Sequence, residues 1–250
     1  MTPSLDIGGR VTVVTGASGG IGRALASAFA EAGAKVVGTA RRAEALDSWR
    51  RETTGATAAV AGDIAGPEAA TEMAEALAEP FGPPDILINA AGLNTREAAD
   101  DVTVQGWRAT IDINLATPFF LAQAFVPAMK DKGWGRILNI ASLQSERAFP
   151  GGLAYGASKG GVAQLTRAMA EAWSRFGITA NAIAPGFFPT DLTAAVFDNP
   201  VRAARNADQT CIGRNGELRD LVGPALFFAS PASDYVTGQV LFVDGGFTAK

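Results

Sequence analysis

The sequence contains no histidine, one cysteine and only two tyrosines among its 250 residues. Without histidine, the most common general acid or base is missing, so proton transfer near neutral pH falls to other side chains. The single cysteine, Cys211, excludes an internal disulfide and any site with several thiolate ligands. A zinc centre is therefore not expected, and we predict no metal site.

The chain also lacks a block of basic residues and has a formal net charge of −4 with a pI near 5.0. This balance indicates neither a nucleic-acid surface nor an anionic-membrane surface. Residues 1–7 have no basic start and no apolar signal core. Polar residues and prolines interrupt the apolar segment 113–129, so we expect a buried helix there rather than a membrane span. We expect a cytoplasmic protein.

Hydrophobic residues make up 48% of the chain, which suffices for a sizeable core. Short β-branched runs alternate along it with longer alanine-rich helical patterns. The expected strands are Val11–Thr15, Lys35–Thr39, Thr57–Ala61, Asp85–Asn89, Arg136–Ile140, Ile178–Ile183 and Gln239–Val243. The expected helices lie near Ile21–Ala32, Pro67–Glu79, Val104–Lys130, Ala154–Phe176 and Glu217–Ala229.

The expected strands are continuous apolar runs, which is typical of strands covered on both faces. Their alternation with helices indicates right-handed crossovers in one parallel sheet. We therefore predict an α/β fold: a single doubly wound Rossmann-like domain over residues 1–250, with a seven-stranded parallel sheet and helices on both faces.

A glycine-rich turn, Thr15-Gly16-Ala17-Ser18-Gly19-Gly20-Ile21-Gly22, follows the first expected strand and opens the first expected helix. Glycines let the backbone approach a phosphate closely, and the helix N-terminus presents free N–H groups and the positive end of its dipole. Taken alone, such a turn can be an ordinary strand-to-helix connection. Its place at the start of an alternating β/α chain favours a dinucleotide site.

Tyr155 and Lys159 are four residues apart on an expected helix, so their side chains share one face. A free phenol has a pKa of about 10, and a neighbouring ammonium favours its ionised form. Because the chain has no histidine, Tyr155 has few rivals as a general acid or base. Together with the dinucleotide turn, the pair indicates hydride chemistry on a carbonyl or an alcohol.

The spacing Gly16-x-x-x-Gly20-x-Gly22 resembles the signature of the short-chain dehydrogenase/reductase family. Other parts of the family's pattern follow in order and extend the resemblance over essentially the whole chain: Asp63, Asn89-Ala90-Ala91-Gly92, Asn114, Ser142, Tyr155-x-x-x-Lys159, Pro185-Gly186 and Val243-Asp244-Gly245-Gly246. Taken jointly, these motifs are highly specific. Ala90 is a small departure, because the family often has a second asparagine there.

The resemblance implies four catalytic residues, Asn114, Ser142, Tyr155 and Lys159. Tyr155 would exchange the proton with the substrate oxygen, and Ser142 would hold that oxygen. Lys159 would lower the phenol pKa and bind the nicotinamide ribose. Asn114 would use a local break in its helix to bind a water that links Lys159 to solvent. Taken singly, Ser142 is more often a turn hydroxyl and Asn114 a tolerated polar helix residue.

The expected cofactor-binding residues are Gly16, Ser18, Gly20, Ile21, Gly22, Arg41, Asp63, Ile64, Asn89, Ala90, Gly92, Tyr155, Lys159, Pro185, Gly186 and Thr190. The second strand ends in Ala40-Arg41-Arg42, whereas an NAD site usually has an acidic residue there. A guanidinium suits phosphate, so we predict NADP(H) with Arg41 as the main 2′-phosphate contact and NAD(H) as the alternative. The two arginines could instead only solvate a helix start.

Substrate choice is expected from residues 142–155 and from a substrate loop at about 187–215. Its glycines and prolines interrupt regular structure, and its apolar residues could close over the substrate as a lid. The alternative is an oligomer-facing helix that never moves. Candidate wall residues, each of which could equally serve packing, are Leu143, Gln144, Phe149, Gly152, Phe187, Phe188 and Leu192.

Residues 142–146 and 244–250 resemble the gluconate 5-dehydrogenase and 2-deoxy-gluconate dehydrogenase branch of the family. The expected partner is a small carbonyl or alcohol, foremost a sugar acid or polyol. A 3-oxoacyl-thioester reductase is the alternative, and a non-catalytic NADP-binding regulator is a more remote one. The apolar helix at 104–130 and the apolar segment 235–242 favour a homotetramer, as does the resemblance.

Overall fold

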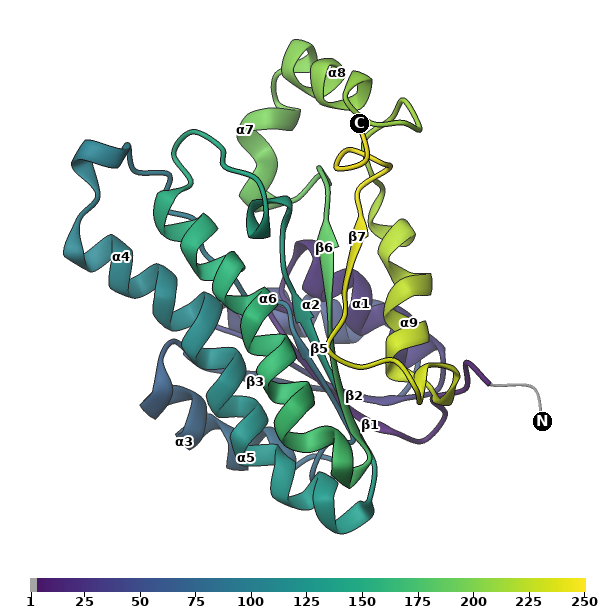
Figure 1. The fold of residues 1–250 in the computed structure, drawn as a ribbon. Helices are drawn as coiled ribbons and strands as arrows, with labels where there is room; N and C mark the ends of the chain where they lie inside the picture. The colour runs from purple at the N-terminus through teal and green to yellow at the C-terminus, as the bar shows by residue number, and fades with distance from the viewer. Residues whose placement is uncertain (1–3) are drawn as a thin grey trace.

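Seven parallel strands form the central sheet of the computed structural model, which describes residues 4–250 (Figure 1). The sheet order is β3-β2-β1-β4-β5-β6-β7, which confirms the doubly wound prediction. The strands are β1 (Val11–Thr15), β2 (Lys35–Ala40), β3 (Thr57–Ala61), β4 (Ile86–Asn89), β5 (Gly135–Ile140), β6 (Ile178–Pro185) and β7 (Val240–Val243). Each agrees with a predicted strand to within two residues.

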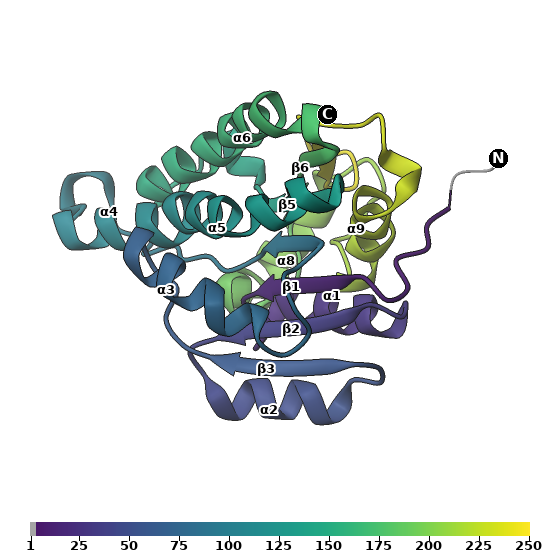
Figure 2. The same cartoon turned by 90° about the horizontal axis from the view of Figure 1, so that it is seen from below.

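Helices cover both faces of the sheet, as Figures 1 and 2 show. One face carries α1 (Gly20–Glu31), α2 (Ala43–Glu52) and α9 (Val222–Ala229), and the other carries α3 (Pro67–Ala78), α5 (Thr117–Lys132) and α6 (Leu153–Trp173). Neighbouring residues of one strand point to opposite faces. Val14 thus belongs to the α1 core, while Val13 belongs to the core under α5.

The predicted long helix at 104–130 is interrupted. It consists of α4 (Val104–Ile111), a π-helical turn at Asp112–Ala116, and α5. The break agrees with the helix irregularity that the family resemblance implies at Asn114. By length and hydropathy, Val104–Lys132 is the one described segment that could cross a membrane. In the structure, however, the inner side chains of α5 pack into the core against the sheet and α3.

Helix α2 was absent from the predicted elements. It is rich in charge, and its apolar face is short, with Leu46 and Trp49 fully buried against the sheet. A stripe of this size gives a weak periodic signal, whereas burial of a tryptophan contributes strongly to packing.

The loop between β6 and α9 is more regular than predicted. It contains α7 (Ala194–Phe197) and α8 (Pro200–Asp208), which stand above the carboxyl ends of the strands (Figure 1). Asn199 begins α8, because its side chain accepts hydrogen bonds from the N–H groups of Val201 and Arg202, both at 3.1 Å. Pro200 supplies a backbone already suited to a first helical residue.

Candidate active site

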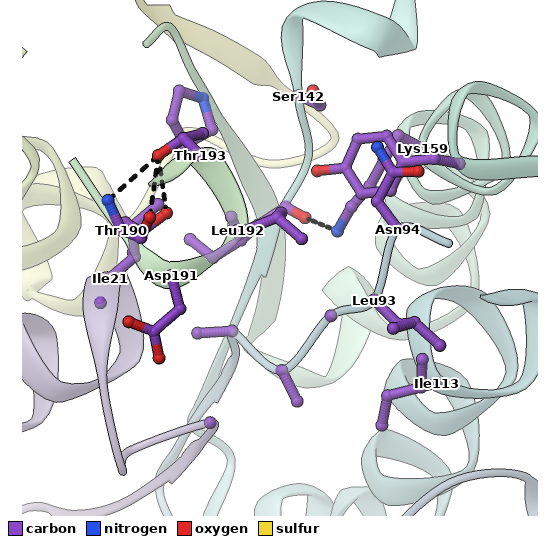
Figure 3. A pocket seen from close by; sticks show the side chains of 18 of the residues that line it. Ile21, Leu93, Asn94, Ile113, Ser142, Lys159, Thr190, Asp191, Leu192 and Thr193 are labelled. Carbon is purple, nitrogen blue, oxygen red and sulfur yellow. Dashed lines mark hydrogen bonds between the residues drawn. The ribbon is translucent and has the colours of Figure 1, made fainter. Parts of the chain in front are cut away.

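A cavity of about 1700 Å³ lies at the carboxyl edge of the sheet, between the strand ends and the 187–215 loop (Figure 3). Open α/β sheets bind ligands at this edge. Every predicted cofactor-binding residue except Asn89 lines the cavity, as do the predicted catalytic residues Ser142, Tyr155 and Lys159. The predicted wall residues also reach it, apart from Gly152, which lies behind Gln144.

The glycine turn at the cavity floor leaves no room for side chains. A Cβ atom on Gly16 would lie 3.0 Å from the backbone of Ala91, and one on Gly22 would lie 2.4 Å from the carbonyl oxygen of Gly16. Helix α1 begins there at Gly20 without a side-chain cap. Its first N–H groups are therefore available to a phosphate, and the turn fits a dinucleotide pyrophosphate.

The end of β2 presents guanidinium groups to the same cavity. Both Arg41 and Arg42 line the wall, and Arg42 Nη2 lies 3.3 Å from Ser18 Oγ and 3.4 Å from Asp191 Oδ2. Arg42 thus reaches across the glycine turn, although the sequence favoured Arg41. No acidic residue stands at the end of β2 to repel a 2′-phosphate, although Arg42 faces the carboxylate of Asp191 in this structure.

Helix α6 and the turn after β5 bring the candidate catalytic side chains together. Tyr155 and Lys159 are 9% and 4% exposed, and Lys159 Nζ lies 5.7 Å from the centre of the Tyr155 ring. Ser142 begins a 3-10 turn, Leu143–Ser145, and its hydroxyl lies close enough to the phenol to lower the phenol pKa. Ser145 donates to the carbonyl oxygen of Lys159 at 2.8 Å, which fixes the turn against α6.

The pKa of Tyr155 differs from the sequence-based expectation. Burial raises the pKa of the phenol, and the Ser142 hydrogen bond and the charge of Arg96 lower it by less. Burial also lowers the pKa of Lys159 to about 8. The ammonium donates to the carbonyl oxygen of Ile140 at 2.6 Å and does not bond to the phenol (Figure 3). The expected lowering of the phenol pKa by Lys159 is therefore not present in this structure.

Asn114 lies in the π turn and is buried, but its side chain is fully engaged. Its Oδ1 accepts from the Leu93 N–H at 2.8 Å, while Nδ2 donates to the Leu93 carbonyl oxygen at 2.8 Å and to Ser158 Oγ at 2.9 Å. The side chain therefore ties the segment after β4 to helix α6. A relay water would therefore bind to the backbone of the turn, and the predicted water-binding role of Asn114 stays a prediction.

The Asn89 side chain is buried and does not line the cavity wall. Its Nδ2 donates to Asn139 Oδ1 at 2.9 Å, within the sheet. The sequence placed it in the cofactor cleft because it ends β4, but a side chain at a strand end can point into either layer. The structure therefore gives no support to a direct cofactor contact by this side chain.

Arg96 is a candidate site residue that the sequence analysis missed. It is the one non-glycine residue with positive φ, at 55°, among the residues that the structure describes. An Asx turn supports this unusual backbone, because Asn94 Oδ1 accepts from the Arg96 N–H at 3.0 Å. The guanidinium donates to the carbonyl oxygen of Leu192 and lies close enough to lower the phenol pKa. No sequence motif marks it, and the one visible signal was a basic residue shortly after the Asn89-Ala90-Ala91-Gly92 segment.

Fold and site together define a class: an α/β enzyme of the nicotinamide-dinucleotide type, with an uncapped helix after a glycine turn and with a tyrosine and a lysine on one helix face. The comparison with protein families is more specific. A family model described as "Enoyl-(Acyl carrier protein) reductase" matches residues 16–248. The chain belongs to the short-chain dehydrogenase/reductase family, whose members are NAD(P)-dependent oxidoreductases that act on CH–OH groups.

The relatives that match over nearly their full length include both a sugar-acid dehydrogenase and an oxoacyl-thioester reductase. The gluconate 5-dehydrogenase of Gluconobacter oxydans is 40% identical over 248 residues, which cover 98% of this chain and 97% of that protein. The 3-oxoacyl-[acyl-carrier-protein] reductase of Vibrio cholerae is 36% identical over 242 residues, covering 97% and 98%.

A solved gluconate 5-dehydrogenase from Burkholderia cenocepacia, in complex with NADP and tartrate, has a similar structure. It superposes with a TM-score of 0.90 at 38% identity and covers 98% of this chain and 99% of its own.

Proposed function

We propose that this protein is an NADP(H)-dependent oxidoreductase that interconverts a secondary alcohol and a ketone on a sugar acid. The observation that carries the proposal is Arg96, whose guanidinium faces the cavity beside Tyr155. A guanidinium matches the geometry of a carboxylate, and it stays charged at any physiological pH. An acid whose reacting carbon lies near Tyr155 would find its countercharge there.

The charge of the whole cavity supports an anionic substrate and an anionic cofactor. Although the chain carries a net charge of −4, basic residues outnumber acidic ones on this wall. The basic residues are Arg41, Arg42, Arg96, Arg108, Lys159, Arg202 and Arg205, against Asp63, Asp112 and Asp191. Clefts lined by one sign of charge concentrate ligands of the other sign.

The cofactor proposal rests on the glycine turn and the arginines after β2. The N–H groups that begin α1 would hold the pyrophosphate, and Arg42 with Arg41 would hold the 2′-phosphate of NADP(H). Asp63 and Ile64 would border the adenine. Thr190, whose side chain lies 3.2 Å from the Cβ position of Gly20, would contact the cofactor's phosphate or its carboxamide. When bound, the nicotinamide supplies or accepts the hydride.

The protein's own residues handle the proton. Because burial raises the pKa of Tyr155, the phenol is protonated at neutral pH and can donate to the carbonyl oxygen during reduction. Ser142 orients the same oxygen and stabilises its developing charge. In the oxidation direction, Tyr155 must first lose its proton, which the charge of Arg96 favours.

Arg96 variants test the sugar-acid proposal against its alternatives. We expect Arg96→Gln to raise KM for 5-ketogluconate or gluconate about 10–100-fold, because a charge-assisted pair is lost, and to leave polyols and cyclic ketones nearly unaffected. A matched control is Arg175→Gln, at an exposed arginine far from the cavity. A wild-type enzyme that reduces oxoacyl thioesters but no sugar acid would replace the proposal with the thioester reductase. Absence of turnover on the whole panel would favour the non-catalytic regulator.

We also propose a homotetramer in the cytoplasm. Large apolar side chains are exposed on α4 (Val104 and Trp107), at the start of α6 (Leu153) and on the edge strand β7 (Leu241). Apolar side chains gathered on exposed elements often mark association surfaces. Light scattering at micromolar concentration measures the assembly, and an active monomer would overturn this part of the proposal.

A further inference from the structure

Gln144 combines a buried, unpaired amide oxygen with a place on the cavity wall. Its Oε1 has no hydrogen-bond partner among the described residues, although it is shielded from solvent. The residue as a whole is only partly buried, and its Nε2 makes no hydrogen bond and is not among the buried unpaired atoms. The amide oxygen therefore lies against the start of α6, while the residue lines the cavity and its Nε2 donors are unused by the described residues.

The protein holds this amide in a defined slot. Gln144 follows Ser142 in the 3-10 turn, and its N–H donates to Ser142 Oγ at 3.1 Å. Its side chain lies against the beginning of α6, where a Cβ on Gly152 would stand 2.0 Å from Oε1 and one on Gly156 would stand 3.5 Å away. Gly152 has φ of −116°, which any residue can adopt, so the backbone does not require glycine there. Glycine is required there because a side chain would occupy the space of the Gln144 amide.

The buried oxygen faces Gly152 and is out of a ligand's reach, whereas Nε2 carries N–H donors that no described residue accepts and that a ligand oxygen can accept. The slot adjoins Ser142 and Tyr155, so the group reached by Gln144 lies next to the reacting carbon. An amide offers an acceptor and two donors, and a hydroxyl can serve either one. The match therefore holds whichever way the amide is turned.

We propose that Gln144 reads a hydroxyl group on the carbon next to the reacting centre and so selects polyhydroxylated substrates over simple ketones. This inference rests on the proposed function, but it does not require the carboxylate that Arg96 would bind. Two residues would then share substrate recognition: Arg96 would bind the carboxylate, and Gln144 would bind the neighbouring hydroxyl.

The test compares substrates that differ in that hydroxyl. In the holoenzyme with NADP(H), we expect Gln144→Met to lower kcat/KM about tenfold for 5-ketogluconate and for a ketose without a carboxylate. Reduction of cyclohexanone, which has no neighbouring hydroxyl, should change less than about twofold. Methionine keeps the length and the backbone contact to Ser142, and Gln164→Met on the exposed side of α6 is the matched control.

A second variant keeps the glutamine and removes its slot. Gly152→Ala should displace the amide and produce the same selective loss. Equal losses on hydroxylated and plain ketones would show a structural role and overturn the proposal, as would no loss on either. A loss on the ketose with no sugar-acid turnover by the wild-type enzyme would retain the Gln144 proposal and reject the sugar-acid function. A wild-type enzyme that reduces only unhydroxylated carbonyls would reject both.

Discussion

The ammonium nitrogen of Lys159 lies 2.6 Å from the carbonyl oxygen of Ile140, at the carboxyl end of β5. This bond holds a buried charge against the sheet edge on which the cofactor is proposed to bind. Lys159 is thus positioned by β5 as well as by its own helix. It has one donor committed and others left for a ribose hydroxyl.

Burial of Lys159 should destabilise the protein without cofactor at neutral pH. Because its pKa falls to about 8 in the folded state and is about 10.4 when unfolded, the charged form costs folding free energy below pH 8. We expect Lys159→Met to raise the free energy of unfolding at pH 7 by about 1–3 kcal/mol while abolishing activity. Urea titrations of both proteins measure the difference.

The sign of the pH dependence provides the check on this prediction. Between about pH 8 and 10.4 the unfolded chain binds the Lys159 proton and the folded chain does not, so wild-type stability should approach that of the variant as pH rises through this window. Lys35→Met, at an exposed lysine, should show no such convergence. A variant less stable than wild type at pH 7 would contradict the assignment of burial as the dominant cause.

Tyr155→Phe should retain the fold and the cofactor and lose turnover. The substitution deletes the transferable proton and the bond to Ser142 but keeps the buried ring. General acid–base catalysis is worth about 10²–10⁴ in rate, and the loss could exceed that because the phenol also positions substrate. Steady-state kcat and NADPH fluorescence titration separate the two effects. Wild-type kcat in the variant would rule out this tyrosine as the acid/base.

Cofactor selectivity tests the two arginines after β2. We expect the wild-type enzyme to prefer NADP(H), and Arg42→Ala to lower kcat/KM for NADP(H) about 10–100-fold with little change for NAD(H). Comparison with Arg41→Ala decides which guanidinium is the main 2′-phosphate contact. Ala40→Asp combined with Arg41→Gln should shift preference toward NAD(H). A wild-type preference for NAD(H) would show that the end of β2 was misinterpreted.

The loop at 187–215 should be the part of the enzyme most protected by cofactor binding. Its turn at Asp191–Thr193 is held by Arg42 through Asp191 and by Arg96 through the Leu192 carbonyl oxygen. Both arginines are proposed to bind ligand anions, so ligand binding should rearrange these contacts and close the loop. Hydrogen exchange with and without NADP(H) measures this. Equal protection in both states would favour a rigid, oligomer-facing element.

Local patterns in the sequence suffice to predict the sheet, the glycine turn and the placement of Tyr155 and Lys159 on one helix face. Continuous apolar runs allow few alternatives to a covered parallel sheet, a turn that excludes Cβ atoms must be glycine, and residues four apart on a helix share a face. Hence β1 to β7, Gly16 with Gly22, and Tyr155 with Lys159 were found where the sequence predicted them. These properties are local, so local patterns record them.

Which polar side chains reach the cavity depends instead on how distant segments of the chain pack together. Arg96 faces Tyr155 because an Asx turn holds its backbone at positive φ. The Asn89 side chain turns into the sheet and hydrogen-bonds to Asn139, and the Asn114 side chain hydrogen-bonds to the backbone of Leu93. Gln144 was already a candidate, but its unpaired oxygen became visible only once Gly152 was packed against it. Side-chain direction in loops, and the partners left over after folding, depend on contacts between segments far apart in the chain, which no local pattern encodes.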